Sequence, residues 1–237
     1  MSPAPVKQAA RDAVRILPPA EGYERWASSY DATPNPLLAL EERELVPLLP
    51  PVARKRVLDL CCGTGRWLRI LAAHLPALLV GVDASAAMLG IANRGFRRLV
   101  RADCLELPFA DGSFDFVICS FAVGHLAELG RFARECTRIL KPNGNLFVTD
   151  LHPDAYARGW RTGFRDSQGA AEIRTVSHPW RDSVRLFSSI GLGCAAMHEF
   201  RFGDAERKIF FQAGKNGLFS QAGRIPAVLL GRFWRIN

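Results

Sequence analysis

The residues most able to do chemistry surround a glycine turn in the first third of the chain. Residues 57–60 form an apolar strand pattern, Cys61-Cys62-Gly63-Thr64-Gly65 is a turn of small residues, and a helical pattern follows at once. Small residues at such a turn allow the backbone to approach a ligand at the N-terminus of the helix. Asp83 ends the next strand, 18 residues after Gly65, where an acid can bind both hydroxyls of a ribose. Asp103 ends the strand after that.

Two common nucleotide sites do not fit this turn. A dinucleotide fingerprint, G-x-G-x-x-G, requires a third glycine at position 68, which is Leu68. A P-loop requires a lysine after its last glycine, and Gly65 is followed by Arg66. Asp59, in the strand before the turn, would repel a pyrophosphate but attract an ammonium or a sulfonium. These residues therefore favour a cationic ligand over a nicotinamide cofactor or ATP.

Two histidines are candidates for a general base. His125 follows a strand predicted over 114–120, and His152 follows a strand predicted over 145–151. Ligands of open α/β sheets bind at the carboxyl ends of the strands, and histidine is the usual base near neutral pH. We therefore predict His125 and His152 as catalytic residues, with a helix-capping role as the alternative for His125.

The elements that must position these residues alternate along the chain. Strands are predicted over 56–60, 78–82, 99–102, 114–120, 145–151, 194–202 and 225–234. Helices are predicted over 66–74, 85–94, 129–140, 179–190 and 204–211. Strands alternating with helices of this length are typical of a parallel sheet with right-handed crossovers.

Two further regions flank this alternation. An apolar stripe at helical spacing (Val6, Ala10, Ala13, Val14 and Leu17) predicts a first helix that Pro18 and Pro19 end, and helices over 22–29 and 36–49 follow. Residues 156–164 and 170–176 flank a turn at 166–169 and predict a hairpin. We therefore expect one domain with four parts: an N-terminal helical cap (1–50), a core that binds the ligand (51–151), a lid hairpin (152–178), and a C-terminal helix with strands (179–237).

Composition narrows the class of protein. Of 237 residues, 49% are hydrophobic and 23% are charged, which excludes disorder as the main state. The net charge of +8 invites a nucleic-acid partner, but the arginines are scattered and form no single face. The six cysteines show no C-x-x-C pair and no zinc spacing, so no metal is expected. The N-terminus lacks the apolar segment of a signal peptide and no apolar run is long enough to span a membrane, so a cytoplasmic protein is expected.

Four motifs in order then resemble one family. They are LDLCCGTG (58–65), GVDAS (81–85), RADCLELPFADGSFDFVICSFAVGHL (101–126) and LKPNGNLFVTD (140–150). Residues 23–151 resemble a class I S-adenosylmethionine-dependent methyltransferase of the small-molecule type 11 group, which includes ubiquinone and menaquinone biosynthesis enzymes. The resemblance implies an α/β Rossmann-like doubly wound sheet, mostly parallel with an antiparallel last strand. N-terminal helices and the inserted hairpin would act as a lid.

The resemblance also implies which residues bind S-adenosylmethionine. Its methionine end would lie against Asp59, Gly63 and Gly65, with Tyr30 closing over it and Ser120 and Phe121 nearby. Asp83 would bind the ribose, and the adenine would contact Ala84, Met88, Asp103 and Cys104. Cys61 departs from the family pattern, which has glycine at this position, and a side chain there narrows the turn unless the thiol points into the sheet.

The acceptor is expected to be a small aromatic or anionic molecule. Trp160, Arg161 and Arg165 of the hairpin, facing Tyr23 and Trp26, would suit a planar acceptor with a carboxylate or phosphate. The alternative for the hairpin is an exposed surface with solvated arginines. The predicted function is methyl transfer to this acceptor by a monomer or homodimer. Alternatives are a non-catalytic S-adenosylmethionine-binding partner module, a tRNA or protein methyltransferase, and a relative that uses the cofactor for another reaction.

Overall fold

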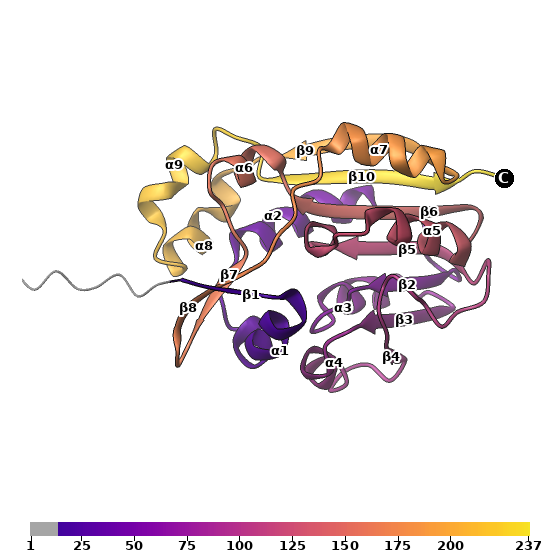
Figure 1. Ribbon diagram of the computed structural model, residues 1–237, viewed down its shortest axis with the longest axis horizontal. Coiled ribbons are helices and arrows are strands. Elements are labelled where there is room, and N and C mark those ends of the chain that lie inside the picture. The colour runs from indigo at the N-terminus through magenta and orange to yellow at the C-terminus, as the bar shows by residue number, and fades with distance from the viewer. Residues whose placement is uncertain (1–13) are drawn as a thin grey trace, which may run out of the picture.

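The larger sheet carries the predicted alternation. The computed structural model describes residues 14–237 and contains a seven-stranded sheet of order β4-β3-β2-β5-β6-β10-β9 (Figure 1). The strands are β2 (Arg56–Leu60), β3 (Leu78–Asp83), β4 (Leu99–Arg101), β5 (Phe114–Ser120), β6 (Leu140–Leu151), β9 (Leu192–Phe200) and β10 (Val228–Arg235). Neighbours from β2 to β6 pair in parallel, whereas β10 is antiparallel to both β6 and β9. The predicted α/β Rossmann-like sheet with an antiparallel last strand is confirmed.

Helices cover both faces of this sheet. One apolar cluster includes Phe132 of α5 (Leu129–Ile139) and Phe187 of α7 (Trp180–Ser189). The other includes residues of α2 (Pro36–Leu45), α3 (Arg66–Ala72), α8 (Arg207–Gln212) and α9 (Phe219–Ala222). Val57, Leu58 and Leu60 of β2 are fully buried, as expected for a parallel strand that is covered on both faces. The remaining elements of this body are α4 (Ala86–Ala92) and the short 3₁₀ turns η1 (Val46–Leu48), η2 (Val123–His125), η3 (Asp204–Glu206) and η4 (Asn216–Leu218).

A second, three-stranded sheet is formed by the lid and the N-terminal strand. Its order is β1 (Arg15–Leu17), β8 (Gly169–Ile173) and β7 (Gly163–Asp166), and α1 (Pro19–Tyr30) packs on it. Leu17, Trp26, Phe164 and Ile173 form the apolar cluster between the helix and this sheet. Figure 1 shows α1, β1, β7 and β8 together at one end of the larger sheet. The N-terminal strand β1 is therefore part of the lid, together with β7 and β8.

Two of the predicted elements need correction. The helix predicted to end at Leu17 is wrong over Arg15–Leu17, which pairs in parallel with β8. Burial of Leu17 and the hydrogen bonds of the pairing outweigh the helical spacing, which is a weak local preference. Val6, Ala10 and Ala13 of that stripe lie outside the described residues. The first arm of the hairpin is shorter than predicted, because Pro153–Ala157 form α6 instead.

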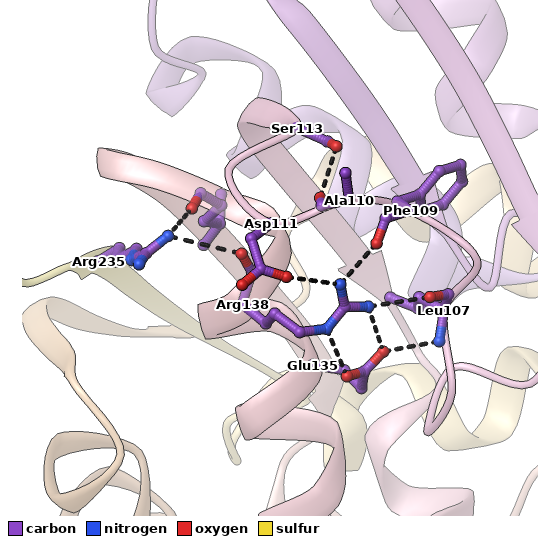
Figure 2. A network of polar contacts seen from close by, with 9 residues as sticks. Leu107, Phe109, Ala110, Asp111, Ser113, Glu135, Arg138 and Arg235 are labelled. Atoms are coloured by element: carbon purple, nitrogen blue, oxygen red, sulfur yellow. Dashed lines mark hydrogen bonds and ion pairs between the residues drawn. The ribbon is translucent and has the colours of Figure 1, made fainter.

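An arginine fixes the loop between β4 and β5. Arg138 of α5 donates two hydrogen bonds to the Glu135 carboxylate, each 2.8 Å, and others to the carbonyls of Leu107 and Phe109 (Figure 2). The backbone N–H of Leu107 in turn donates to Glu135 over 2.7 Å. Such a two-pronged charged pair sets geometry as well as energy. The loop that follows Asp103 is thereby held against α5.

The helices of this fold are short. Across residues 14–237, none of them combines the length and the hydropathy that a membrane span requires.

Candidate active site

A cavity of about 450 Å³ lies at the carboxyl ends of β2, β3 and β5, beneath α1. Of the eleven residues predicted to bind the cofactor, all except Gly65 line it. Gly65 has φ +86° and begins α3, so this glycine turns the chain into the helix instead of forming the cavity wall. His125 and Tyr23 also line the cavity. The structure therefore brings the predicted cofactor residues and one predicted base into a single space.

Asp83 is held with both carboxylate oxygens fixed. Oδ2 accepts a hydrogen bond from the N–H of Gly63 and Oδ1 accepts one from the N–H of Ser85, each over 2.8 Å. Burial raises the pKa of Asp83, and these two N–H groups oppose that shift. Each oxygen keeps capacity for a further donor, because a carboxylate oxygen has two lone pairs. The arrangement can accept two hydroxyl groups side by side.

Glu24 joins α1 to the start of α4, directly after Asp83 in the chain. Its carboxylate accepts from the Ser85 hydroxyl over 2.6 Å and from the N–H of Ala87 over 3.2 Å, at the start of α4. Ser85 caps this helix and accepts from the N–H of Met88. Glu24 was not predicted as a site residue, because nothing in the local sequence of an exposed helix indicates that this glutamate has a partner more than 60 residues away.

Asp59 is buried without a full set of partners. Its side chain is 1% exposed, and Oδ2 has no hydrogen-bond partner. Burial raises the pKa of Asp59 to about 8. A buried carboxyl that lacks a partner is costly, and a cationic donor from a ligand would satisfy it. The buried, incompletely paired carboxyl of Asp59 therefore supports the predicted contact with the ammonium of a methionine group.

Cys61 occupies the turn in a left-handed conformation with φ +58°. Its side chain packs against the apolar cluster that contains Cys104 and also Cys119 of β5, and so is directed toward the sheet. Because the thiol points toward the sheet, it does not cross the glycine turn. All six cysteines are free thiols. The departure from glycine is therefore accommodated by the packing of Cys61 against this cluster, within the wall of the cavity.

A second buried carboxylate, Glu41 of α2, lies behind the cavity. It is fully buried and pairs with Arg66, while Trp67 donates to it over 3.3 Å. The hydroxyls of Ser120 and Thr149 donate to its other oxygen. Glu41 was not among the predicted site residues. Its position between Leu37 and Leu45, in the apolar stripe of α2, could have indicated its role, because a charged residue in such a stripe needs buried partners.

The predicted base His125 forms a pair with Tyr23. His125 Nδ1 lies 2.9 Å from the carbonyl oxygen of Arg174, which can only accept, so Nδ1 carries the proton. Nε2 of the neutral ring is then the acceptor, and the Tyr23 hydroxyl donates to it over 2.9 Å. Burial raises the pKa of Tyr23 well above its ordinary value, so the phenol stays protonated. The Tyr23–His125 pair can take up one proton at Nε2.

The structure does not bring the other predicted catalytic residue to this cavity. His152 is 4% exposed and caps α6, where its Nδ1 accepts from the N–H of Asp154 over 3.1 Å. Its Nε2 lies 3.4 Å from Glu199 of β9. His152 is absent from the cavity wall, because the chain turns into α6 directly after β6 and directs the ring toward β9.

Four of the five predicted acceptor residues also lie elsewhere. Trp26 stacks on Phe164 with ring centroids 5.3 Å apart inside the lid. The ring of Trp160 stacks on Phe202, and the guanidinium of Arg161 lies over the Tyr156 ring. Arg165 is exposed on β7, and none of these four side chains lines the cavity. Tyr23 alone of the predicted acceptor residues does so.

The strand order, the antiparallel β10 and the acids at the ends of β2 and β3 define a Rossmann-like methyltransferase fold. Residues 58–148 match a family model described as "Methyltransferase domain". Together with the fold, this match identifies residues 58–148 as a methyltransferase domain similar to those of class I S-adenosylmethionine-dependent methyltransferases, whose methyl donor is S-adenosylmethionine.

The sequence is also similar to those of known methyltransferases. The chain is 41% identical over 111 residues to a malonyl-[acyl-carrier protein] O-methyltransferase of Legionella pneumophila, covering 44% of this chain and 39% of the relative. It is 34% identical over 139 residues to a demethylmenaquinone methyltransferase of Thermotoga maritima, covering 55% of this chain and 60% of the relative. The matches thus span less than two thirds of these relatives.

A solved structure supports the fold alone. The S-adenosylmethionine dependent methyltransferase of Mesorhizobium loti has a TM-score of 0.68 and 23% identity, covering 85% of this chain and all of that one.

Proposed function

We propose that this protein transfers a methyl group from S-adenosylmethionine to a small aromatic acceptor that carries an ionisable hydroxyl. The cavity supports this proposal. Its wall contains the fixed carboxylate of Asp83, the carboxyl of Asp59 that lacks a partner, and the Tyr23–His125 pair. When bound, S-adenosylmethionine supplies a methyl group on a positively charged sulfur.

Four side chains would hold the cofactor. Asp83 would accept both ribose hydroxyls, since each of its oxygens is already oriented by a backbone N–H. Asp59 would accept from the ammonium group, and Met88 would lie against the adenine. Arg66 lines the cavity and its Nη1 has no hydrogen-bond partner, so this guanidinium suits the carboxylate of the methionine end.

The Tyr23–His125 pair would remove the proton of the acceptor. Neutral His125 can accept the Tyr23 proton at Nε2 while the Tyr23 oxygen takes the proton of the acceptor hydroxyl. The acceptor, now a phenolate, would form the new bond to the methyl carbon as the bond between that carbon and the sulfur breaks, so that S-adenosylhomocysteine leaves and the proton remains on His125. General base catalysis of this kind contributes about 10²- to 10⁴-fold to a rate.

The cavity wall and the relatives support an aromatic acceptor. Pro19, Ala20, Tyr23 and Leu126 give the acceptor side an apolar and aromatic lining. The arginines expected to select an anionic acceptor, Arg161 among them, lie away from it. Relatives named as demethylmenaquinone methyltransferases favour the same class, whereas the name of the malonyl-[acyl-carrier protein] relative favours a carboxylate.

The test is a methyl-transfer assay on the full chain. Formation of S-adenosylhomocysteine is measured with hydroquinone, catechol, benzoate and malonate as probe acceptors. We expect turnover with the phenols, a loss of about 100-fold or more in kcat for His125→Ala, and unchanged turnover for His152→Ala. Cofactor binding without turnover on any phenol would overturn the proposal in favour of a non-catalytic module, and turnover only on malonate would overturn the acceptor class.

A further inference from the structure

The segment that leaves the lid is attached to the loop that carries the base. This return segment (173–178) makes three hydrogen bonds to consecutive residues of the loop after β5. The N–H of Val176 donates to the Gly124 carbonyl over 2.6 Å, and His125 Nδ1 donates to the Arg174 carbonyl over 2.9 Å. His178 Nε2 donates to the Leu126 carbonyl over 2.8 Å. Every second residue of the return segment thus contacts this loop.

The same segment also positions Tyr23. Ile173 is 1% exposed and packs against α1 at Gly22, where an added Cβ would lie only 2.8 Å from Ile173 Cγ1. Gly22 is therefore required for the close approach of α1 to the lid, and Tyr23 is the next residue. Adjacent residues of the lid, Ile173 and Arg174, consequently hold the two members of the Tyr23–His125 pair.

Asp150 holds the same loop from the sheet. Its carboxylate accepts from the N–H of Gly124 and, over 2.6 Å, from the N–H of Leu151. An added Cβ on Gly124 would lie 3.0 Å from Asp150 Oδ2, so a larger residue there would have to displace the carboxylate. Asp150 thus fixes the loop from the side of the sheet. Within residues 14–237, the His125 ring makes polar contacts with the Tyr23 hydroxyl and with the Arg174 carbonyl of the return segment.

We propose that docking of the lid assembles the base: the carbonyl of Arg174 fixes His125 as its Nδ1–H tautomer, and Ile173 places Tyr23 against the free Nε2. Ile173 and Arg174 are positioning residues, since they act through His125 and Tyr23 and do not line the cavity. An undocked lid leaves Nδ1 without its acceptor and separates the pair. Proton uptake is then confined to the closed cavity. The catalytic consequence rests on the proposed function, whereas the tautomer does not.

The test reads the tautomer directly. ¹⁵N NMR of the histidine rings is recorded on the full chain without any ligand, and His125 is assigned by its loss in His125→Gln. We expect the Nδ1–H tautomer in the wild type, and a shift toward the Nε2–H tautomer in Ile173→Ala and in Val176→Pro. Arg174→Ala is the matched control, because its exposed side chain is lost while its carbonyl remains. The signals of His198, whose ring stacks on Phe200 in β9 away from the lid, report whether each variant keeps its fold.

Two outcomes would overturn the inference: an Nε2–H tautomer for His125 in the wild type, or an unchanged tautomer in both folded lid variants. A turnover assay then separates this inference from the proposed function. If methyl transfer occurs, Ile173→Ala should lower kcat by about 100-fold, the lower range of general base catalysis, with the KM of S-adenosylmethionine unchanged. A shifted tautomer in a protein without turnover would leave the inference standing and remove the proposed function.

Discussion

Replacing Asp59 by Asn should stabilise the protein without its ligand, and the gain should grow with pH. Burial raises the pKa of Asp59 to about 8, whereas the pKa of an unfolded Asp is about 3.9. At pH 7 the folded state must therefore hold a proton that the unfolded state has released. At about 1.36 kcal/mol per pH unit, the three units between 3.9 and 7 cost roughly 4 kcal/mol. The Asn side chain removes this cost because it is neutral at every pH.

The sign and the range of pH follow from the same two values. Because the folded pKa of Asp59 is raised, its protonation favours the folded state at low pH, and the contribution of Asp59 to stability falls as pH rises from about 4 to about 8. The amide N–H of Asn would lack a hydrogen-bond acceptor at the position of Oδ2, as the O–H of the protonated Asp59 does. The free-energy cost of an unsatisfied donor is therefore the same in both proteins. The difference between them should be roughly 1.5 kcal/mol at pH 5 and roughly 4 kcal/mol at pH 7.

Urea unfolding at pH 5, 6 and 7 measures this difference. Asp182→Asn is the control, since Asp182 is exposed on α7 and should show no dependence on pH relative to the wild type. A gap between Asp59→Asn and the wild type that stays constant from pH 5 to 7 would refute the reasoning. It would mean that Asp59 is ionised when the cavity is empty.

Three further substitutions test buried or charged contacts elsewhere in the fold. Glu41→Gln should lower the free energy of unfolding by about 3 kcal/mol because it leaves a buried guanidinium without its carboxylate, whereas Glu42→Gln, exposed on the same helix, should change it by less than about 0.5 kcal/mol. Arg138→Ala should lower the free energy of unfolding by about 2 kcal/mol, because its charged hydrogen bonds are lost. Arg131→Ala, which removes only a surface ion pair, should lower it by less than about 1 kcal/mol, and urea unfolding measures both values. His152→Ala should cost about 1 kcal/mol through the lost cap of α6 while methyl transfer is unchanged; a loss of turnover in a folded variant would return His152 to the catalytic site.

The core was predictable because parallel strands leave a strong signal. A strand covered on both faces reads as a continuous apolar run, and β2 and β5 begin and end at the predicted residues. The carboxyl ends of such strands meet at one edge of the sheet, which is why Asp59, Asp83 and Ser120 could be placed around one cavity from their positions alone. The helices of the core are also where the sequence puts them.

The lid was less predictable because its contacts join distant segments. Arg15–Leu17 has helical spacing but pairs with β8, more than 150 residues later in the chain. The aromatic and arginine content of the hairpin is real, yet Trp160 turns to Phe202 and Arg161 to Tyr156. Composition indicates which side chains a segment carries, whereas their direction depends on packing against elements that the local pattern does not contain. The partnership of His125 with Tyr23 is of the same kind.

Calorimetric titration with S-adenosylmethionine tests the central claim most directly. The wild-type protein should bind the cofactor at a single saturable site, Asp83→Ala should lose this binding while remaining folded, and Asp182→Ala should bind like the wild type. Binding that survives in Asp83→Ala, or the absence of binding by the folded wild-type protein, would contradict the assignment of the cavity as the cofactor site.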